Sequence, residues 1–352
     1  MMNNSKIAVV GASGAVGEVM LSILAERGYA AKQVIPLASE RSAGELVDFG
    51  NKQLAIQVLA DFDFTGIDFA LFSAGGSVSK EHAPRAAAAG AVVIDNTSAF
   101  RYDDDIPLVV PEVNADAMRD VTTGAIIANP NCSTIQMVVA LAPIHRAVGI
   151  TRINVATYQS VSGAGRRGLH ELATQTAQRL NFQEIEVSKF AQPIAFNALP
   201  QIDEMLENGY SREEMKMHWE TRKIFADDAI MVNATAVRVP VFYGHSEAVH
   251  FETREPIGLD QVRALLRAAP GVEVVEGEGM IHATAVTHAA GTDPVYVSRL
   301  RRDLSHPNGI DMWVVADNIR KGAALNAVQI MQWLEEKRSM AGNGAQANVN
   351  SA

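Results

Sequence analysis

The chain has 352 residues, of which 48% are hydrophobic and 20% charged, a composition typical of a folded globular protein and unlike that of a disordered or membrane protein. Its formal net charge of −10 argues against a nucleic-acid partner or an anionic membrane surface. A single cysteine excludes an intramolecular disulfide, and no apolar run approaches the about 20 residues that span a bilayer, so the expected location is the cytoplasm.

The first half of the chain alternates short apolar strands with helices. Residues 6–10 are expected to form a strand, and residues 17–28 a helix that ends at Gly28. Apolar strands that alternate with helices predict a parallel sheet with helices on both faces, an α/β fold of the Rossmann-like, dinucleotide-binding kind. Further strands are expected at 33–38, 68–74, 91–96 and 125–128, and further helices at 82–89 and 135–142.

The second half has longer strands and, after a helix at 218–226, little further helix until the end of the chain. This pattern predicts an α+β domain on a largely antiparallel sheet, and the helix at 318–338 has a strong apolar stripe at helical spacing. The strands are expected at 153–161, 231–241, 247–253, 294–301 and 310–317.

The length and the change of pattern predict two domains. The dinucleotide-binding domain is expected to span residues 1–130 and to be completed by the C-terminal helix at 317–340. The catalytic and dimerisation domain is expected at 131–316. Residues 341–352 are small and polar, and a disordered tail is expected there.

Three glycines stand directly after the first strand, in "GASGAVG". Gly11, Gly14 and Gly17 permit a tight turn and bring backbone N–H groups close to a pyrophosphate at a helix N-terminus. Dinucleotide binding is therefore favoured over a purely structural turn, although the GxxGxxG spacing departs from the more common GxGxxG.

The end of the second strand bears on the choice between NAD and NADP. An acidic residue there binds the 2′-hydroxyl of NAD, whereas an arginine accommodates the 2′-phosphate of NADP. Glu40 and Arg41 are adjacent, so both readings are open. Arg41 with the hydroxyl of Ser42 favours NADP, and the alternative is a solvated charged turn.

The only cysteine, Cys132 in "NPNCST", lies where a helix is expected to begin. Free cysteines are most often buried packing residues, but a helix N-terminus lowers the pKa of a thiol and makes it a nucleophile. Beside a dinucleotide site, such a thiol suggests aldehyde oxidation through a thioester. His245, in a Gly-His-Ser turn, is a candidate base, and Arg238 a candidate ligand for a carboxylate.

Several longer blocks of the chain carry a family resemblance. "GASGAVGEVML", "DNTSAFR", "VPEVN", "NPNCST", "TYQSVSGAG", "RVPVFYGHSEAV" and "DNIRKGAALNAVQI" resemble bacterial aspartate-β-semialdehyde dehydrogenases from the first strand to the last helix. The resemblance implies NADPH-dependent, reversible reduction of L-aspartyl 4-phosphate to L-aspartate 4-semialdehyde and phosphate, in lysine, diaminopimelate, methionine and threonine biosynthesis. It also implies a homodimer formed through the second domain.

The resemblance assigns a role to individual residues. Cys132 is implied as the thioester nucleophile, His245 as the acid/base catalyst and Gln159 as the residue that orients substrate. Arg238 and Glu220 are implied to bind the substrate carboxylate and amino group, and Arg101, Asn131 and Lys223 to bind phosphate. Besides Arg41 and Ser42, the implied cofactor positions are Gly11, Ser13, Gly14, Ala15, Val16, Ser162, Gly163 and Asn318, and Asn318 departs from the glutamine of relatives.

Two rival functions remain. N-acetyl-γ-glutamyl-phosphate reductase uses the same thioester chemistry, but "NPNCST" with "GHSEAV" argues against it, and a free-amine substrate needs a carboxylate. A non-catalytic dinucleotide-binding homologue would usually have lost the thiol or the imidazole, and this chain has both. The sequence contains no G-x-S-x-G motif, which argues against a serine hydrolase. A zinc site is not expected, because the chain has one cysteine and no close histidine pair of the H-E-x-x-H type.

Overall fold

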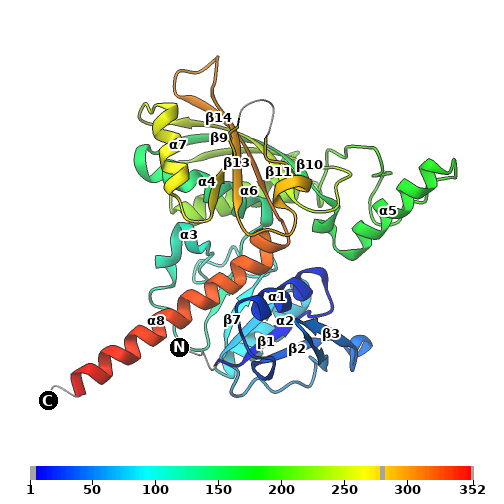
Figure 1. The fold of residues 1–352 in the computed structure, drawn as a ribbon, viewed down its shortest axis with the longest axis vertical. Coiled ribbons are helices and arrows are strands. Elements are labelled where there is room, and N and C mark those ends of the chain that lie inside the picture. The colour runs from blue at the N-terminus through cyan, green and yellow to red at the C-terminus, as the bar shows by residue number, and fades with distance from the viewer. Residues whose placement is uncertain (1–4, 278–281, 350–352) are drawn as a thin grey trace. The chain divides into compact units, whose positions relative to one another are not determined.

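The computed structural model describes residues 5–277 and 282–349, and the chain forms two compact units (Figure 1). One unit is Met1–Asn129 with Ala324–Ala352, and the other is Pro130–Ala323. The C-terminal return to the first unit was expected at residue 317, seven residues earlier. Residues 317–323 belong to the second unit because they pack there: Gly291 N donates to Asp317 Oδ2 at 2.7 Å.

The first unit is built on a six-stranded sheet in the order β5-β2-β1-β6-β7-β8, and every neighbouring pair is parallel. This is the predicted Rossmann-like sheet, and the prediction is confirmed. The strands are β1 (Ile7–Val10), β2 (Val34–Ala38), β5 (Gln57–Val58), β6 (Phe69–Phe72), β7 (Val92–Asp95) and β8 (Ile126–Ala128). A short hairpin of β3 (Leu46–Phe49) and β4 (Lys52–Ala55) was not predicted.

Helices cover both faces of this sheet. Alternate residues of β1 point to opposite faces, so Ile7 and Val9 pack in one apolar cluster while Ala8 and Val10 pack in another. The first cluster contains residues of α1 (Ala15–Glu26) and α8 (Leu325–Val349), and the second contains residues of α2 (Gly76–Ala88). Burial on both faces is why these strands are continuously apolar.

The second unit is built on a six-stranded, mostly antiparallel sheet in the order β10-β9-β11-β14-β13-β12. Only the outer pairs β10–β9 and β12–β13 are parallel, which confirms the predicted α+β character. The strands are β9 (Ile150–Gln159), β10 (Met231–Arg238), β11 (His245–Thr253), β12 (Val272–Val274), β13 (Val295–Arg302) and β14 (Gly309–Ala316).

Three helices pack on one face of this sheet: α4 (Cys132–Val148), α6 (Arg212–Phe225) and α7 (Leu259–Ala268). On β10, Ala234 and Ala236 are buried, whereas Met231, Asn233 and Thr235 on the opposite face are exposed. The sheet therefore has an inner face under the helices and an outer face with exposed side chains.

Several helices differ from the sequence expectation. α7 and α5 (Arg166–Leu180) were not predicted; in α5 only four residues are buried, so its apolar pattern is weak. Before α8, residues Arg320–Ala324 form one π-helical turn. The disordered tail expected at 341–352 is not seen in residues 341–349, which continue α8, although two glycines and two asparagines there disfavour a helix; residues 350–352 lie outside the described part. No helix of the described residues is long and apolar enough to cross a membrane.

Candidate active site

Cys132 is the first residue of α4, as the sequence predicts. Asn131 caps this helix: its Oδ1 accepts hydrogen bonds from Ser133 N at 3.0 Å and Thr134 N at 3.3 Å. The thiol is partly exposed. At this position the positive end of the helix dipole stabilises a thiolate, so the fold gives Cys132 the environment of a reactive cysteine.

A glycine of the π-helical turn lies against the thiol residue. A Cβ added to Gly322 would lie 2.8 Å from Cys132 Cβ, closer than two carbon atoms can approach. Gly322 N donates to Asp317 O at 3.0 Å, so the backbone there is held in place. Only glycine therefore lets the turn pack at this distance from Cys132.

His245, at the start of β11, is completely buried. Its Nδ1 accepts a hydrogen bond from Ser160 N at 3.1 Å, so in the neutral ring the proton is on Nε2. Burial, reinforced by the charge of Arg238, lowers the pKa of His245 to about 3. The imidazole is therefore neutral near pH 7, and its Nε2–H has no partner among the described residues.

Arg238, the last residue of β10, is the cation beside this imidazole. Its Nη1 donates to Ser160 O at 2.7 Å, and its charge interacts with Cys132. A Cβ on Gly163 would lie 3.0 Å from Arg238 Nη1 and 3.4 Å from His245 Nε2. The bare backbone of Gly163 thus leaves room next to both groups for a bound molecule.

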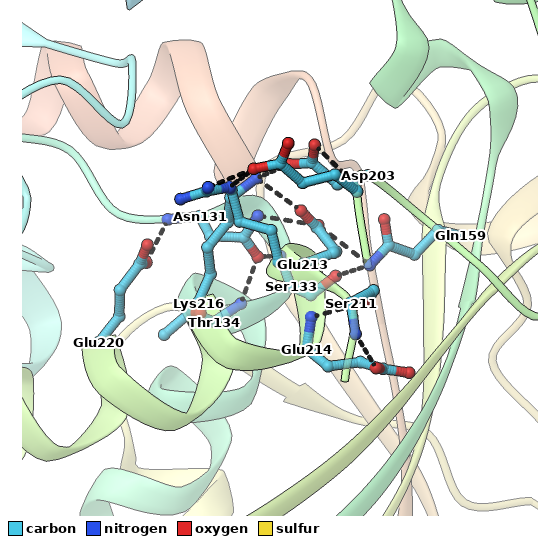
Figure 2. A network of polar contacts seen from close by, with 12 residues as sticks. Asn131, Ser133, Thr134, Gln159, Asp203, Ser211, Glu213, Glu214, Lys216 and Glu220 are labelled. Carbon is cyan, nitrogen blue, oxygen red and sulfur yellow. Dashed lines mark hydrogen bonds and ion pairs between the residues drawn. The ribbon is translucent and has the colours of Figure 1, made fainter. Parts of the chain in front are cut away.

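Gln159 connects this group to the start of α4. It is buried at the end of β9, and its Nε2 donates to Ser133 Oγ at 2.8 Å and to Glu213 Oε1 at 3.3 Å. The structure therefore brings Gln159 next to the residue that follows the thiol (Figure 2).

Glu213 and Lys216 on α6 also belong to this site, and the sequence did not identify them. Asn131 Nδ2 donates to Glu213 Oε1 at 2.9 Å, and Lys216 Nζ lies 3.0 Å from Glu213 Oε2 (Figure 2). Burial alone would raise the pKa of Glu213, but the Lys216 charge and the Asn131 hydrogen bond lower it to about 2. Glu213 is a buried, permanently charged carboxylate.

Glu220 and Lys223, the pair chosen from the sequence, lie two helical turns further along α6. Glu220 is completely buried, and its Oε2 accepts a hydrogen bond from Asn131 N at 2.6 Å. Both pairs have the pattern Glu-x-x-Lys, seven residues apart on one helix, so spacing alone could not distinguish them. In the structure Glu220 supports the backbone next to the thiol, whereas Glu213 faces Gln159.

Asn318 connects the two loops on either side of His245. Its Oδ1 accepts hydrogen bonds from Ser160 Oγ and Ser162 Oγ, both at 3.1 Å, and from Gly244 N at 3.0 Å. Its Nδ2 is buried and has no partner in the described part of the chain. Asn318 therefore fixes the loop that precedes His245, and its Nδ2–H groups can donate hydrogen bonds to a bound molecule.

The glycine turn of the first unit fits a pyrophosphate. A Cβ on Gly11 would lie 2.7 Å from Ser73 O, and one on Gly17 would lie 2.1 Å from Gly11 O. Gly14 caps α1 without a side chain, so the first-turn N–H groups, which have no partner within the helix, are left for an anion. The turn includes the predicted positions Ser13, Ala15 and Val16.

The other predicted residues of the first unit differ in exposure. Arg41 is exposed and Ser42 partly exposed, in a 3₁₀ turn (Glu40–Ser42) that follows β2. Arg101 is buried, and its Nη2 donates to Asn96 O at 3.0 Å. Within the described residues, no cluster of three or more histidine, cysteine or acidic side chains could hold a metal ion.

Comparison with known proteins identifies the two units. A model of the semialdehyde dehydrogenase NAD-binding domain matches residues 6–121, and a model of the semialdehyde dehydrogenase dimerisation domain matches residues 141–321. Aspartate-semialdehyde dehydrogenase of Legionella pneumophila is 59% identical over 338 residues, which cover 96% of this chain and 97% of that protein.

Solved structures agree. Aspartate semialdehyde dehydrogenase II of Vibrio cholerae, in complex with ASA, has a TM-score of 0.91 and 57% identity, covering 94% of this chain and 98% of that one. The Candida albicans enzyme with NADP, 23% identical, shares the fold with a TM-score of 0.74 over 95% of this chain and 99% of that one. The chain belongs to the aspartate-semialdehyde dehydrogenase family.

Proposed function

We propose that this protein catalyses the reversible, NADPH-dependent reduction of L-aspartyl 4-phosphate to L-aspartate 4-semialdehyde and phosphate, through a thioester on Cys132. The observation that carries the proposal is the thiol at the first position of α4 in the same unit as a buried, neutral imidazole whose Nε2–H is unpaired. In the test, NADPH formation from the semialdehyde and NADP⁺ beyond the first turnover is expected to require phosphate. Turnover that does not depend on phosphate would contradict the proposal.

The steps are described in the direction of aldehyde oxidation. The Cys132 thiolate attacks the aldehyde carbon, and the oxygen of the resulting tetrahedral adduct takes the negative charge. His245 Nε2–H can donate a hydrogen bond to this oxygen, since the neutral ring carries its proton there. A nicotinamide cofactor, when bound, would take up the hydride that leaves the adduct carbon, so that Cys132 is left as a thioester. Phosphate then attacks the thioester carbon and displaces the Cys132 thiolate, and the acyl phosphate forms.

The chain's own residues account for selectivity toward the amino acid. We assign the substrate carboxylate to Arg238, which is buried with its guanidinium beside Ser160 and Gly163. The free ammonium group needs a carboxylate, and Glu213 is charged and adjacent to Gln159. N-acetyl-γ-glutamyl-phosphate has no free amine, so Glu213 favours aspartate semialdehyde over that rival. Glu220 stays the sequence-based alternative.

The cofactor is proposed to be NADP rather than NAD. Within the first unit, the glycine turn fits a pyrophosphate. Within the second unit, Asn318, whose Nδ2 has no partner among the described residues, stays a sequence-based cofactor position together with Ser162 and Gly163. Arg41 is an exposed cation directly after β2, where a 2′-phosphate is bound in this fold class.

Arg41→Asp is expected to weaken the binding of NADP much more than that of NAD, because the 2′-phosphate loses a nearby cation and is repelled by the new carboxylate. Loss of one charge-assisted contact corresponds to about 10- to 150-fold in the KM for NADP. The matched control is Lys52→Asp, an equal charge change at another exposed position of the same unit. Equal losses for NADP and NAD in Arg41→Asp would assign the turn a structural role.

Within the second unit, phosphate is proposed to be bound by a lysine of α6 together with Asn131. The sequence suggests Lys223, whereas the contacts of Lys216 with Glu213 place Lys216 in the group around Gln159. The Lys216 side chain is 13% exposed and also contacts Asp203 at 2.8 Å. The two lysines therefore make a direct comparison possible.

Lys216→Gln is expected to raise the KM for phosphate by about 10- to 150-fold, because one charge-assisted contact is lost. Lys223→Gln is the matched control on the same helix, and a change of less than threefold is expected there. Thermal unfolding of both variants separates lost binding from lost folding. The opposite ranking would return the phosphate assignment to Lys223.

The assembly is proposed to be a homodimer that forms through the outer face of the second sheet. Two large apolar side chains are exposed on this face: Met231 is 58% exposed and Tyr158 39% exposed. The matched dimerisation-domain model, over residues 141–321, supports a dimer formed through the second unit. The cytoplasmic location stays a prediction.

A further inference from the structure

One more buried acidic residue, Glu247, lies close to the active-site residues, and the reaction as described does not use it. Glu247 is on β11 two residues after His245, so both side chains are on the inner face of the sheet. Glu247 is completely buried. Neither of its carboxyl oxygens has a hydrogen-bond partner among the residues that the structure describes.

The neighbours of Glu247 connect it to the catalytic groups. On β9 the residue opposite Glu247 is Thr157, whose Oγ1 accepts a hydrogen bond from Gln159 Nε2 at 3.3 Å. On α4, one turn after Cys132, Gln136 Nε2 donates to the His245 carbonyl oxygen at 3.4 Å. Glu247 therefore lies on the inner face of the sheet, next to residues that contact the groups around the thiol.

The Gln136 side chain has an acceptor oxygen that lacks a hydrogen-bond donor. Its Oε1 is buried and, in the described part of the chain, has no donor. An ionised carboxylate offers no proton to this oxygen, but a neutral carboxylic acid does. Burial raises the pKa of Glu247 well above its usual value, and the neighbouring Gln136 side chain, which lowers this pKa, offsets the effect of burial only in part.

We propose that Glu247 is a positioning residue for the reaction: as an uncharged carboxylic acid, it donates a hydrogen bond to Gln136 Oε1 and so fixes the amide that holds the backbone of His245. The orientation of Nε2–H toward the tetrahedral adduct depends on that backbone. An uncharged Glu247 also adds no negative charge near the Cys132 thiolate. The proposal rests on the proposed role of His245.

The test compares Glu247→Gln, Glu247→Leu and the control Ser298→Ala. Glutamine keeps a neutral donor, so kcat is expected to stay within about threefold of wild type, whereas leucine has no donor and should lower kcat about 10-fold with KM unchanged. Ser298 is a buried hydroxyl on β13 with no partner among the described residues, and its removal should leave kcat unchanged.

Stability and infrared spectra separate positioning from a structural role. Leucine removes a buried polar group but also the hydrogen bond to Gln136 Oε1, so the thermal midpoint is expected to change little. A slower but equally stable enzyme then indicates positioning. The infrared difference between wild type and Glu247→Gln at pH 7 is expected to contain the carbonyl band of a protonated acid. This spectrum needs no turnover, so its outcome is independent of the proposed function.

Three results would overturn the proposal. Wild-type kcat in Glu247→Leu would remove the positioning role. A glutamine variant as slow as the leucine variant would mean that the ionised form is required. Carboxylate bands in place of the acid carbonyl in the infrared difference would mean that Glu247 is charged.

Discussion

Replacement of Cys132 by serine is expected to abolish turnover while the fold is kept. Serine is similar in size and is tolerated at the first position of a helix, so α4 and its Asn131 cap should be unchanged. A serine hydroxyl is not ionised near neutral pH, and the helix dipole cannot make it equivalent to a thiolate. Loss of a covalent nucleophile lowers kcat on the order of 10⁴- to 10⁶-fold.

The controls use the fact that Cys132 is the only cysteine. Alkylation of the wild type by iodoacetamide should abolish activity at one mole per chain, and the serine variant should not react. Substrate should still raise the thermal midpoint of the serine variant, because Arg238 and Glu213 remain. A serine variant with more than a hundredth of wild-type kcat would exclude a covalent intermediate.

Replacement of His245 by alanine is expected to lower kcat by about 10²- to 10⁴-fold, which is the usual contribution of one positioned hydrogen-bond donor or acid/base group. KM for the semialdehyde should change little, since Arg238 and Glu213 bind the substrate ends. Because the pKa of His245 is about 3, kcat/KM should show no limb from this residue between pH 5 and 8. A wild-type kcat in the alanine variant would assign His245 a structural role.

The same low pKa predicts how stability depends on pH. Between pH 6.5 and about 3 the unfolded chain binds a proton on His245 that the folded chain does not bind. The free energy of unfolding should therefore fall as pH falls through this range, by up to about 1.4 kcal/mol per pH unit from this group. His245→Gln should reduce that slope in urea unfolding measured from pH 7 to 4, and an unchanged slope would mean that His245 has an ordinary pKa in the folded protein.

The parts of the fold that were predicted correctly are those in which the local pattern of apolar residues indicates which side chains are buried. In β1, a short apolar run directly before a glycine turn indicates a buried strand, and the alternation of such runs with helices predicts the parallel sheet. α5 has few apolar residues and was not found because its apolar stripe is weak. The return of the chain to the first unit was misplaced for a different reason: the contact between Gly322 and Cys132 joins residues distant in sequence.

The site residues that were predicted correctly are those whose local structure is determined by their neighbours in the sequence. Cys132 at a helix start is such a case, because the capping residue directly precedes it in the sequence. Glu213 and Lys216 were missed because an identical Glu-x-x-Lys pair occurs seven residues later, and both glutamates contact Asn131. The contact with Gln159 distinguishes Glu213. Glu247 could not be found by pattern, since its unpaired state depends on α4 and β9 together.

The most direct test of the thioester is the mass of the protein during a single turnover without phosphate. Wild-type enzyme mixed with aspartate semialdehyde and NADP⁺ is expected to release about one equivalent of NADPH and to gain the mass of one aspartyl group on the peptide that contains Cys132. Addition of phosphate should restore the original mass. Release of NADPH with no added mass on this peptide would contradict the account, because the acyl group would then never be attached to Cys132.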